Sequence, residues 1–243
     1  MEIDFELVVP AYNEAKSIPL LVQRTVAAAK KFGFNSDSFR LVIVQNGSTD
    51  ESQKVLTEIH RSSLGEWIRI VEVPVNQGYG FGLYSGLQTT TARFVGWTHA
   101  DLQCLPEDAF KAILKLKECK EPNVLVKGVR RGRNWKDRFV SRVFELFARI
   151  LLGLKVYEIN AQPKVFPRFL LDSLRNPPKT FALDLYLLYH AKKGNFSTQV
   201  IEVEFPPRIH GTSKWAMTFF SRFKTISGII RYMKYLASTE GKL

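Results

Sequence analysis

The chain has 243 residues, of which 45% are hydrophobic and 24% are charged. These values fit one large globular domain, or at most two small ones, and exclude a disordered or low-complexity chain. Only two cysteines occur, Cys104 and Cys119, and there is neither a Cys/His cluster nor a secretory signal. The sequence therefore predicts a reducing, cytoplasmic setting rather than a disulfide framework.

Positive charge is concentrated in the second half of the chain. The formal net charge of the chain is +12. Residues 1–110 contain 9 Lys or Arg and 13 Asp or Glu, whereas residues 111–243 contain 26 Lys or Arg and 10 Asp or Glu. Either a polyanionic partner or a solvated surface explains this asymmetry. No helix-turn-helix, zinc-finger, RNP or KH pattern accompanies the charge, which argues against nucleic acid. No apolar run reaches the 18 residues that a membrane-spanning helix requires.

The first hundred residues repeat a pattern of strand, polar loop and helix. Apolar runs predict strands at 5–9, 41–44, 68–73 and 94–98, and helical spacing predicts helices at 17–29, 51–60 and 80–89. Such alternation predicts an α/β fold with a mostly parallel sheet covered by helices on both faces. Ligands bind such sheets beyond the carboxyl ends of the strands, so the loops after Val9, Val44, Val73 and Thr98 form the candidate site.

The pattern loosens after Thr98, where the chain changes from a nucleotide-binding half, 1–110, to an acceptor half, 111–214, within one domain. In this second half, helices are predicted at 106–117, 136–152 and 182–192, and strands at 124–127 and 198–205. Residues 215–243 form a basic, amphipathic helical segment at the end of the chain.

Two of the loops offer groups that suit a nucleotide. After the first strand, Tyr12 presents a flat ring and Glu14 accepts hydrogen bonds from sugar hydroxyls, although a plain helix-capping loop is an alternative. After the second strand, the amides of Gln45 and Asn46 suit a base edge, although Ser48 with Glu51 also matches an ordinary capping box.

The third and fourth loops suggest a phosphate and a cation. Residues 76–82 are rich in glycine but lack the dinucleotide-binding spacing, so Gly78 either lets a nucleotide approach or packs a helix tightly on the sheet. In the fourth loop, His99, Asp101 and Gln103 occupy every second position at the end of a predicted strand. This spacing predicts that the three side chains point to the same side of the strand. Carboxylate, amide and imidazole groups are ligands for a divalent cation, although a lone Asp at a strand end is often structural.

In this order the loops resemble those of family 2 glycosyltransferases with the GT-A fold. The similarity is greatest to the polyprenyl-phosphate sugar transferases related to dolichyl-phosphate mannose synthase. The matching positions are 10–14, 46–50, Asn76, Gly78, Gly80, 100–107, 152–156, 158–166, and Arg208, Gly211, Ser213 and Lys214. The resemblance covers roughly residues 5–214. The sequence departs from the family at Gln45 and Asn46, where two Asp are usual, at His99, where Asp is usual, and at Gln162-Pro163, where Gly-Phe is usual.

The resemblance implies roles for individual residues. Nucleotide binding falls to Pro10, Ala11, Tyr12, Glu14, Gln45, Asn46, Gly78 and Ala100. Asp101, Gln103 and His99 would hold Mg²⁺ or Mn²⁺ on the diphosphate, with the requirement for metal made uncertain by His99. Arg208 and Lys214 would clamp phosphates. A hydroxyl acceptor needs a base, for which Asp184 is the candidate unless it is only a charge at a helix start, whereas a lipid phosphate needs none.

Two segments favour a lipid acceptor. A basic run leads into an apolar helix and consists of Lys127, Arg130, Arg131, Arg133, Lys136, Arg138 and Arg142. Residues 215–235 carry apolar residues at helical spacing beside Arg222, Lys224, Arg231 and Lys234, which predicts a helix lying on an anionic membrane. The alternative is a helix packed on its own domain or on a second subunit of a homo-oligomer.

The predicted function is transfer of a sugar from a nucleotide-diphosphate sugar to a polyprenyl phosphate, with inversion. The enzyme would be peripheral, on the inner face of the membrane. Alternatives are a soluble or glycan hydroxyl acceptor, or a degenerate GT-A protein that acts only through interactions. A nucleotidyltransferase is disfavoured because no basic, glycine-rich loop follows the first strand.

Overall fold

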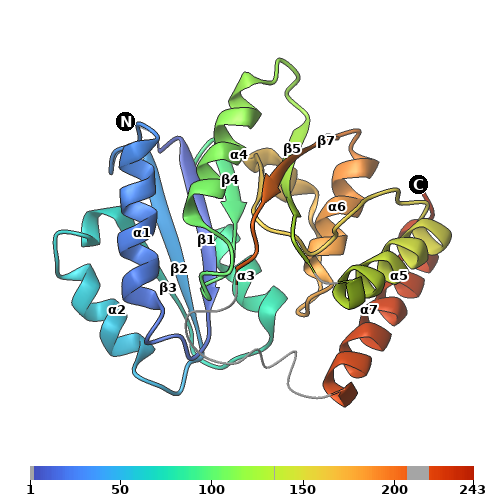
Figure 1. Cartoon of the computed structure of the whole chain (residues 1–243), viewed down its shortest axis with the longest axis horizontal. Coiled ribbons are helices and arrows are strands. Elements are labelled where there is room, and N and C mark those ends of the chain that lie inside the picture. Colours follow the sequence, from blue (N-terminus) through green and yellow to red (C-terminus); the bar gives the residue numbers. More distant parts are fainter. Residues whose placement is uncertain (1–2, 134, 207–218) are drawn as a thin grey trace.

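The computed structural model describes residues 3–133, 135–206 and 219–243, and its elements follow the predicted order closely (Figure 1). The strands are β1 (Phe5–Ala11), β2 (Phe39–Asn46), β3 (Ile68–Val73), β4 (Phe94–Trp97), β5 (Val124–Arg130), β6 (Lys164–Pro167) and β7 (Ser197–Val203). The α-helices are α1 (Ile18–Lys31), α2 (Ser52–His60), α3 (Tyr79–Gln88), α4 (Pro106–Glu118), α5 (Trp135–Leu152), α6 (Leu183–Lys193) and α7 (Phe219–Glu240). Short 3₁₀ turns cover Gly65–Trp67 and Arg168–Ser173.

The strands form one seven-stranded sheet in the order β3-β2-β1-β4-β6-β5-β7. All neighbouring pairs are parallel except β4 with β6 and β5 with β6, which are antiparallel. Because β6 alone runs in the opposite direction, the carboxyl ends of the other six strands lie at one edge. The predicted mostly parallel sheet is confirmed.

The prediction missed β6, and its composition explains why. The strand has four residues, it starts with Lys164, and Pro163 and Pro167 flank or close it. A charge and two prolines argue against a buried strand when only the sequence is considered. Its backbone pairs with the two adjacent strands, where Trp97 and Lys127 lie opposite Lys164. The charge of Lys164 is neutralised by an ion pair with Asp184.

Helices cover both faces of the sheet, as predicted (Figure 1). One core cluster joins the sheet to α1, α2 and α4, and a second joins it to α3, α5, α6 and α7. In α7, Ile229, Met233 and Leu236 are buried in the second cluster. The end of the chain is held as well, because the backbone N–H of Leu243 donates to the carbonyl of Leu152 at 2.9 Å.

None of the helices within the described part of the chain is long and apolar enough to cross a membrane. The division into residues 1–214 and 215–243 stays a prediction, and α7 packs on the domain, mainly along α5.

Candidate active site

The loops after β1 and β2 are tied together at the edge where the parallel strands end. Asn13 adopts a left-handed conformation with φ of 57°, and its side-chain oxygen accepts a hydrogen bond from the Thr49 N–H at 2.8 Å. The Asn13 N–H donates to Ser48 Oγ at 3.0 Å, and the Glu14 N–H donates to Ser52 Oγ at 3.1 Å. The two loops therefore form one rigid unit.

Asp50 holds this unit together. Its carboxylate accepts hydrogen bonds from the Ala15 N–H at 3.1 Å and from the N–H and hydroxyl of Ser52. Burial alone would raise the pKa of Asp50, but these hydrogen bonds outweigh it and lower the pKa. The capping-box alternative for Ser48 and Glu51 is wrong, because Ser48 Oγ is bound by Asn13 and α2 begins at Ser52 without a side-chain cap.

The two amides that replace the usual acids of the family are held by the protein itself. Gln45 accepts a hydrogen bond from the Ser48 N–H at 2.9 Å through its side-chain oxygen. Asn46 is buried and donates to the Gly78 carbonyl at 3.2 Å, and its side-chain oxygen accepts no hydrogen bond from the residues that the structure describes. Tyr12 and Glu14 are half-buried in the neighbouring loop, and the Glu14 carboxylate accepts a hydrogen bond from Ser17.

The glycines of the third loop pack closely against residues 178–180 and against Asn46. Gly78 has φ of 112°, and a Cβ there would lie 2.4 Å from the Lys179 carbonyl oxygen. A Cβ at Gly80 would lie 2.3 Å from the Pro178 oxygen, and one at Gly82 would meet the Asn46 side chain at 2.5 Å. Only the contact at Gly82 matches the predicted packing of the helix on the sheet, because Asn46 ends β2, whereas Gly78 and Gly80 contact the segment before α6. They also bring the segment before α6 across the start of α3.

The predicted metal ligands lie in a turn beyond β4. The strand ends at Trp97, and Leu102 has φ of 58°, so His99, Asp101 and Gln103 do not continue a strand as their alternation predicted. Asp101 is buried and accepts a hydrogen bond from the Gln103 N–H at 3.1 Å. The Gln103 amide donates to the Pro206 carbonyl at 3.2 Å, which joins this turn to the segment after β7. Ala100, also predicted to contact nucleotide, is buried.

His99 lies beside aromatic rings. Its ring centroid is 5.7 Å from that of Tyr79, which stacks on Phe181 at 4.9 Å. Burial lowers the pKa of His99, although Asp101 and Asp184 act in the opposite direction, so the imidazole is neutral at neutral pH. Within the described residues, no three His, Cys, Asp or Glu side chains are grouped around a common point. Of the three predicted ligands, only Asp101 and His99 are of these residue types, and the role of the three in holding a metal stays a prediction.

Asp184, the candidate base, is engaged by the protein. It lies in the first turn of α6 with only 2% of its surface exposed. One oxygen forms an ion pair with the fully buried Lys164 and accepts hydrogen bonds from Gln162 at 2.8 Å and from the Trp97 indole at 3.3 Å. The arrangement makes Asp184 the counter-ion of Lys164.

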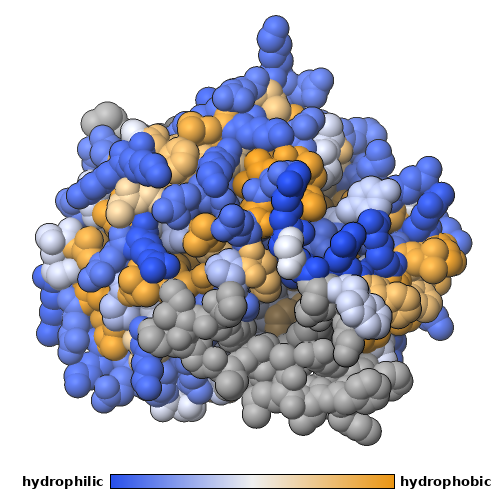
Figure 2. Space-filling view, in the orientation of Figure 1, coloured by the Kyte–Doolittle hydropathy of each residue, from blue (hydrophilic) through white to orange (hydrophobic). Residues whose placement is uncertain are grey.

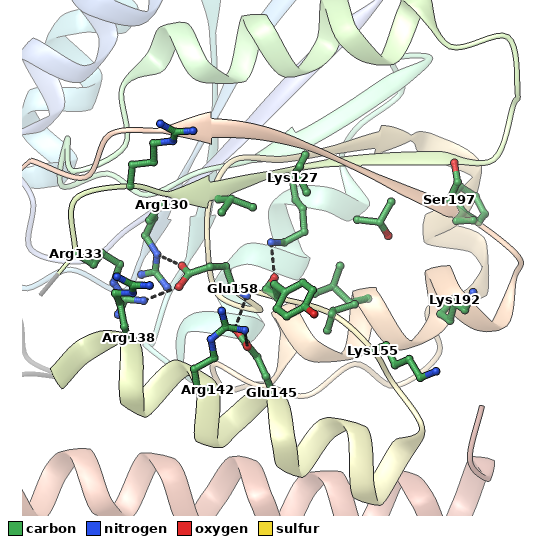
Figure 3. A pocket seen from close by; sticks show the side chains of 18 of the residues that line it. Lys127, Arg130, Arg133, Arg138, Arg142, Glu145, Lys155, Glu158, Lys192 and Ser197 are labelled. Carbon is green, nitrogen blue, oxygen red and sulfur yellow. Dashed lines mark hydrogen bonds and ion pairs between the residues drawn. The ribbon is translucent and has the colours of Figure 1, made fainter. Parts of the chain in front are cut away.

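A cavity of about 1100 Å³ extends from the carboxyl end of β5 to the amino end of β7, between these strands, α5, the loop after α5 and the last part of α6 (Figure 3). It is lined by eight basic side chains and two acidic ones: Lys127, Arg130, Arg131, Arg133, Arg138, Arg142, Lys155, Lys192, Glu145 and Glu158. Glu158 forms ion pairs with Arg130 at 2.6 Å and Arg133 at 2.8 Å. We call this the basic cavity. It contains most of the basic run from Lys127 to Arg142.

Arg130 connects the basic cavity with the turn after β4. It stands at the carboxyl end of β5, and its guanidinium lies 5.3 Å from the Phe205 ring, in the segment that Gln103 also contacts. Its positive charge contributes to lowering the pKa of His99. The basic run indicated part of this cavity, whereas Lys155, although within a segment that resembles the family, and Lys192 were not singled out from the sequence. Arg208 and Lys214, the predicted phosphate clamp, lie outside the described residues.

Comparisons with known proteins agree with this geometry. Residues 6–181 match the sequence model described as glycosyl transferase family 2. An undecaprenyl-phosphate 4-deoxy-4-formamido-L-arabinose transferase of Pectobacterium atrosepticum is 27% identical over 216 residues, which cover 86% of this chain and 62% of that protein. The transferase of the same name from Sodalis glossinidius is 29% identical over 180 residues, covering 72% and 52%. The chain thus spans about half to three fifths of the length of these relatives.

Among solved structures, the fold is similar to that of glucosyl-3-phosphoglycerate synthase from Mycobacterium tuberculosis. Its complex with Mn²⁺, UDP and glucosyl-3-phosphoglycerate has a TM-score of 0.71 at 18% identity, covering 99% of this chain and 81% of that one. Its complex with UDP has a TM-score of 0.67 at 20% identity, covering 94% and 80%. This likeness confirms the predicted GT-A fold, and since the sequence match extends over most of its length, the chain belongs to glycosyl transferase family 2.

Proposed function

We propose that this protein transfers a sugar, with inversion, from a nucleotide-diphosphate sugar to a polyprenyl phosphate presented at a membrane surface. The observation that carries the proposal is the basic cavity, one end of which lies at the strand edge where nucleotide sites of α/β sheets lie. The family supports the sugar transfer, and the names of the two curated relatives support undecaprenyl phosphate as the acceptor.

On the donor side, the joined loops after β1 and β2 would hold the nucleoside, and the turn after β4 would face the diphosphate. Asp101, with His99 and Gln103, would hold a divalent cation there, as the Mn²⁺ and UDP bound by the solved neighbour suggest. When bound, the cation would stabilise negative charge on the leaving diphosphate. Replacing Asp101 by Ala should abolish the metal-dependent part of nucleotide affinity in calorimetry.

On the acceptor side, a phosphate monoester brings its own nucleophile. Its oxygen is already ionised near neutral pH, so the protein needs no general base. Arg130 and Arg133 are held by Glu158 at the mouth of the basic cavity, where their donors suit phosphate oxygens. Under this proposal, Asp184 serves to neutralise and position Lys164 and takes up no proton.

The direct test is a transfer reaction. The full chain is incubated with undecaprenyl phosphate in detergent, a panel of nucleotide sugars, and Mg²⁺ or Mn²⁺, and glycosylated lipid is measured by mass spectrometry. Arg130→Gln should lose at least tenfold in acceptor-dependent rate, whereas Arg24→Gln, an exposed arginine on α1, should keep the wild-type rate.

Two other results of this reaction would favour the alternative functions. Transfer to a soluble sugar but never to the lipid would favour a hydroxyl acceptor, and would restore Asp184 as a base. If no nucleotide sugar binds or reacts with either metal, a non-catalytic interaction protein becomes the better description.

The membrane-facing surface is proposed to include α5. Its exposed apolar side chains are Trp135, Phe139, Leu146 and Ile150, and they share the helix with the exposed Arg138, Arg142 and Arg149. Figure 2 shows apolar side chains gathered over this helix, at the right of the view. Residues 215–235 were predicted to lie on the membrane. In the described part of that segment, however, Met233 of α7 is buried against the domain. Exposed aromatic and aliphatic groups mixed with arginine suit an anionic interface.

A further inference from the structure

Lys127 is a buried lysine whose contacts include no carboxylate. It lies in β5 with 1% of its surface exposed, and its ammonium donates to the carbonyls of Gly128 at 2.9 Å and Tyr157 at 2.8 Å. Within the part of the chain that the structure describes, it forms no ion pair. A buried ammonium held only by carbonyl dipoles retains most of the cost of leaving water.

A second buried lysine provides an internal comparison. Lys164 lies directly opposite Lys127 on β6, so both side chains extend from the same face of the sheet. Lys164 is neutralised by Asp184, whereas Lys127 is not matched in this way. Lys127 instead lines the basic cavity, and Figure 3 shows its side chain directed into it. The place where a counter-charge is missing is therefore also a place that a ligand can approach.

The charged groups around Lys127 do not compensate for its burial. Burial is the main cause that lowers its pKa, to about 7, and the positive charges of Lys164 and Arg130 act in the same direction. Glu158 and Asp184 act in the opposite direction, but each already has its own cationic partner. Near neutral pH the empty cavity thus contains a mixture of neutral and charged Lys127, and a nearby anion would favour the charged form.

We propose that Lys127 makes the basic cavity selective for a doubly charged phosphate monoester over a singly charged phosphodiester, by accepting a proton when the monoester binds. This inference rests on the proposed function, in which a phosphate monoester is the acceptor. It assigns to Lys127 a specificity role and no contact with the reacting atoms.

The charge changes during transfer fit this role. An oxygen of the monoester forms a bond to the anomeric carbon while the bond from that carbon to the diphosphate breaks, and the electron pair leaves with the nucleoside diphosphate. The acceptor phosphate changes from about two negative charges to one as it becomes a diester. Lys127 then loses the field that kept it protonated and returns its proton to solvent. The cavity consequently holds substrate more tightly than product.

The sign of the pH dependence follows from the direction of proton movement. Binding raises the pKa of Lys127 from about 7, so affinity for the monoester must fall as pH rises above that value. Between pH 8 and 9 the monoester is fully ionised, and one proton taken up per ligand corresponds to a loss of about tenfold in affinity per pH unit. A diester, with half the charge, should show a much smaller dependence.

The test is calorimetry of the full chain with farnesyl phosphate, and with its methyl ester as the diester. Titrations at pH 8 in two buffers of different ionisation enthalpy give the number of protons taken up. We expect uptake approaching one proton with the monoester, and an affinity that falls about tenfold by pH 9. In Lys127→Met both the uptake and this pH dependence should disappear. Lys127→Arg, whose charge is permanent, should bind the monoester without uptake and should discriminate less against the diester.

Lys155→Met is the matched control, because Lys155 lines the same cavity but is exposed. It should weaken binding while keeping the proton uptake and the pH dependence. Binding of the monoester without uptake, or uptake that persists in Lys127→Met, would overturn the role of Lys127 and leave the proposed function intact. No binding of either ester at any pH would overturn both.

Discussion

His99 illustrates how a single substitution alters the chemistry of the candidate metal site. With Asp in this position the site would carry one more negative charge, whereas the half-buried imidazole is neutral. Imidazole favours transition metals, and Mg²⁺ prefers oxygen ligands. If His99 contacts a bound metal, the substitution should therefore alter which metal the site prefers.

We expect His99→Asp to shift the metal preference toward Mg²⁺. The added carboxylate oxygen suits the harder ion, so the ratio of Mg²⁺-supported to Mn²⁺-supported nucleotide binding should rise several-fold. Calorimetry with each metal measures this ratio, and Asp101→Ala serves as the control that loses both. An unchanged ratio would mean that His99 does not contact the metal.

The pair formed by Lys164 and Asp184 should be strongly coupled. Asp184→Asn leaves a buried ammonium without a counter-ion, and Lys164→Met leaves a buried carboxylate, so each single variant should lose about 3–5 kcal/mol of unfolding free energy. The double variant should lose much less than the sum, because it removes both charges. Urea unfolding measures the cycle. Additive losses would show that the two groups are not an ion pair in solution.

At the scale of elements, the sequence patterns located every strand except β6 and each α-helix of the described residues, and the errors have identifiable causes. Apolar runs mark β1, β2 and β4 because a strand buried on both faces needs no polar side. β6 was missed because its composition does not indicate a strand. Pairing with β4 and β5, and the ion pair of Lys164 with Asp184, hold it in the sheet. In α7, the apolar stripe was recognised, but periodicity does not distinguish a face that meets lipid from one that meets protein.

The close packing of α3 on the sheet gives a prediction at this scale. A Cβ at Gly86 would lie 2.5 Å from Val44 and 2.6 Å from Val8, so Gly86→Ala should cost about 1–3 kcal/mol of unfolding free energy by pushing the helix outward. Gly228→Ala in α7 is the control, since its Cβ would meet open space, and it should gain roughly 0.5–1 kcal/mol from helix propensity. Thermal or urea unfolding compares them. Equal effects would argue against this packing.

On the scale of the whole molecule, the uneven charge has a structural counterpart. The first half supplies four parallel strands and the joined loops, while the basic second half supplies the basic cavity and α5. The two are continuous through the pairing of β4 with β6, and Arg130, at the carboxyl end of β5, brings one end of the basic cavity to the edge of the site. An anionic surface that attracts the second half would thus lie close to the site.

We expect the chain to sediment with anionic liposomes at low salt and to be released as salt rises. Each arginine of α5 near such a surface contributes about 1 kcal/mol. Phe139→Ser should reduce the bound fraction, whereas Leu114→Ser, on the opposite face of the sheet in α4, should not. Retention of the intact chain in the supernatant at low salt would instead indicate that α5 meets another protein surface.

The sequence by itself determined the order of strands and loops, the family, and the residues at the strand ends, because apolar runs and loop motifs are local properties. Only the tertiary structure decided that Asp184 neutralises Lys164, that Lys127 forms no ion pair with any described residue, and that Lys155 and Lys192 complete the basic cavity. These facts depend on contacts between residues 20 to 65 positions apart, created by the reversed strand β6 and by α5 folding back over β5. Charge balance inside a protein is set by such neighbours in space, and no spacing along the chain records them.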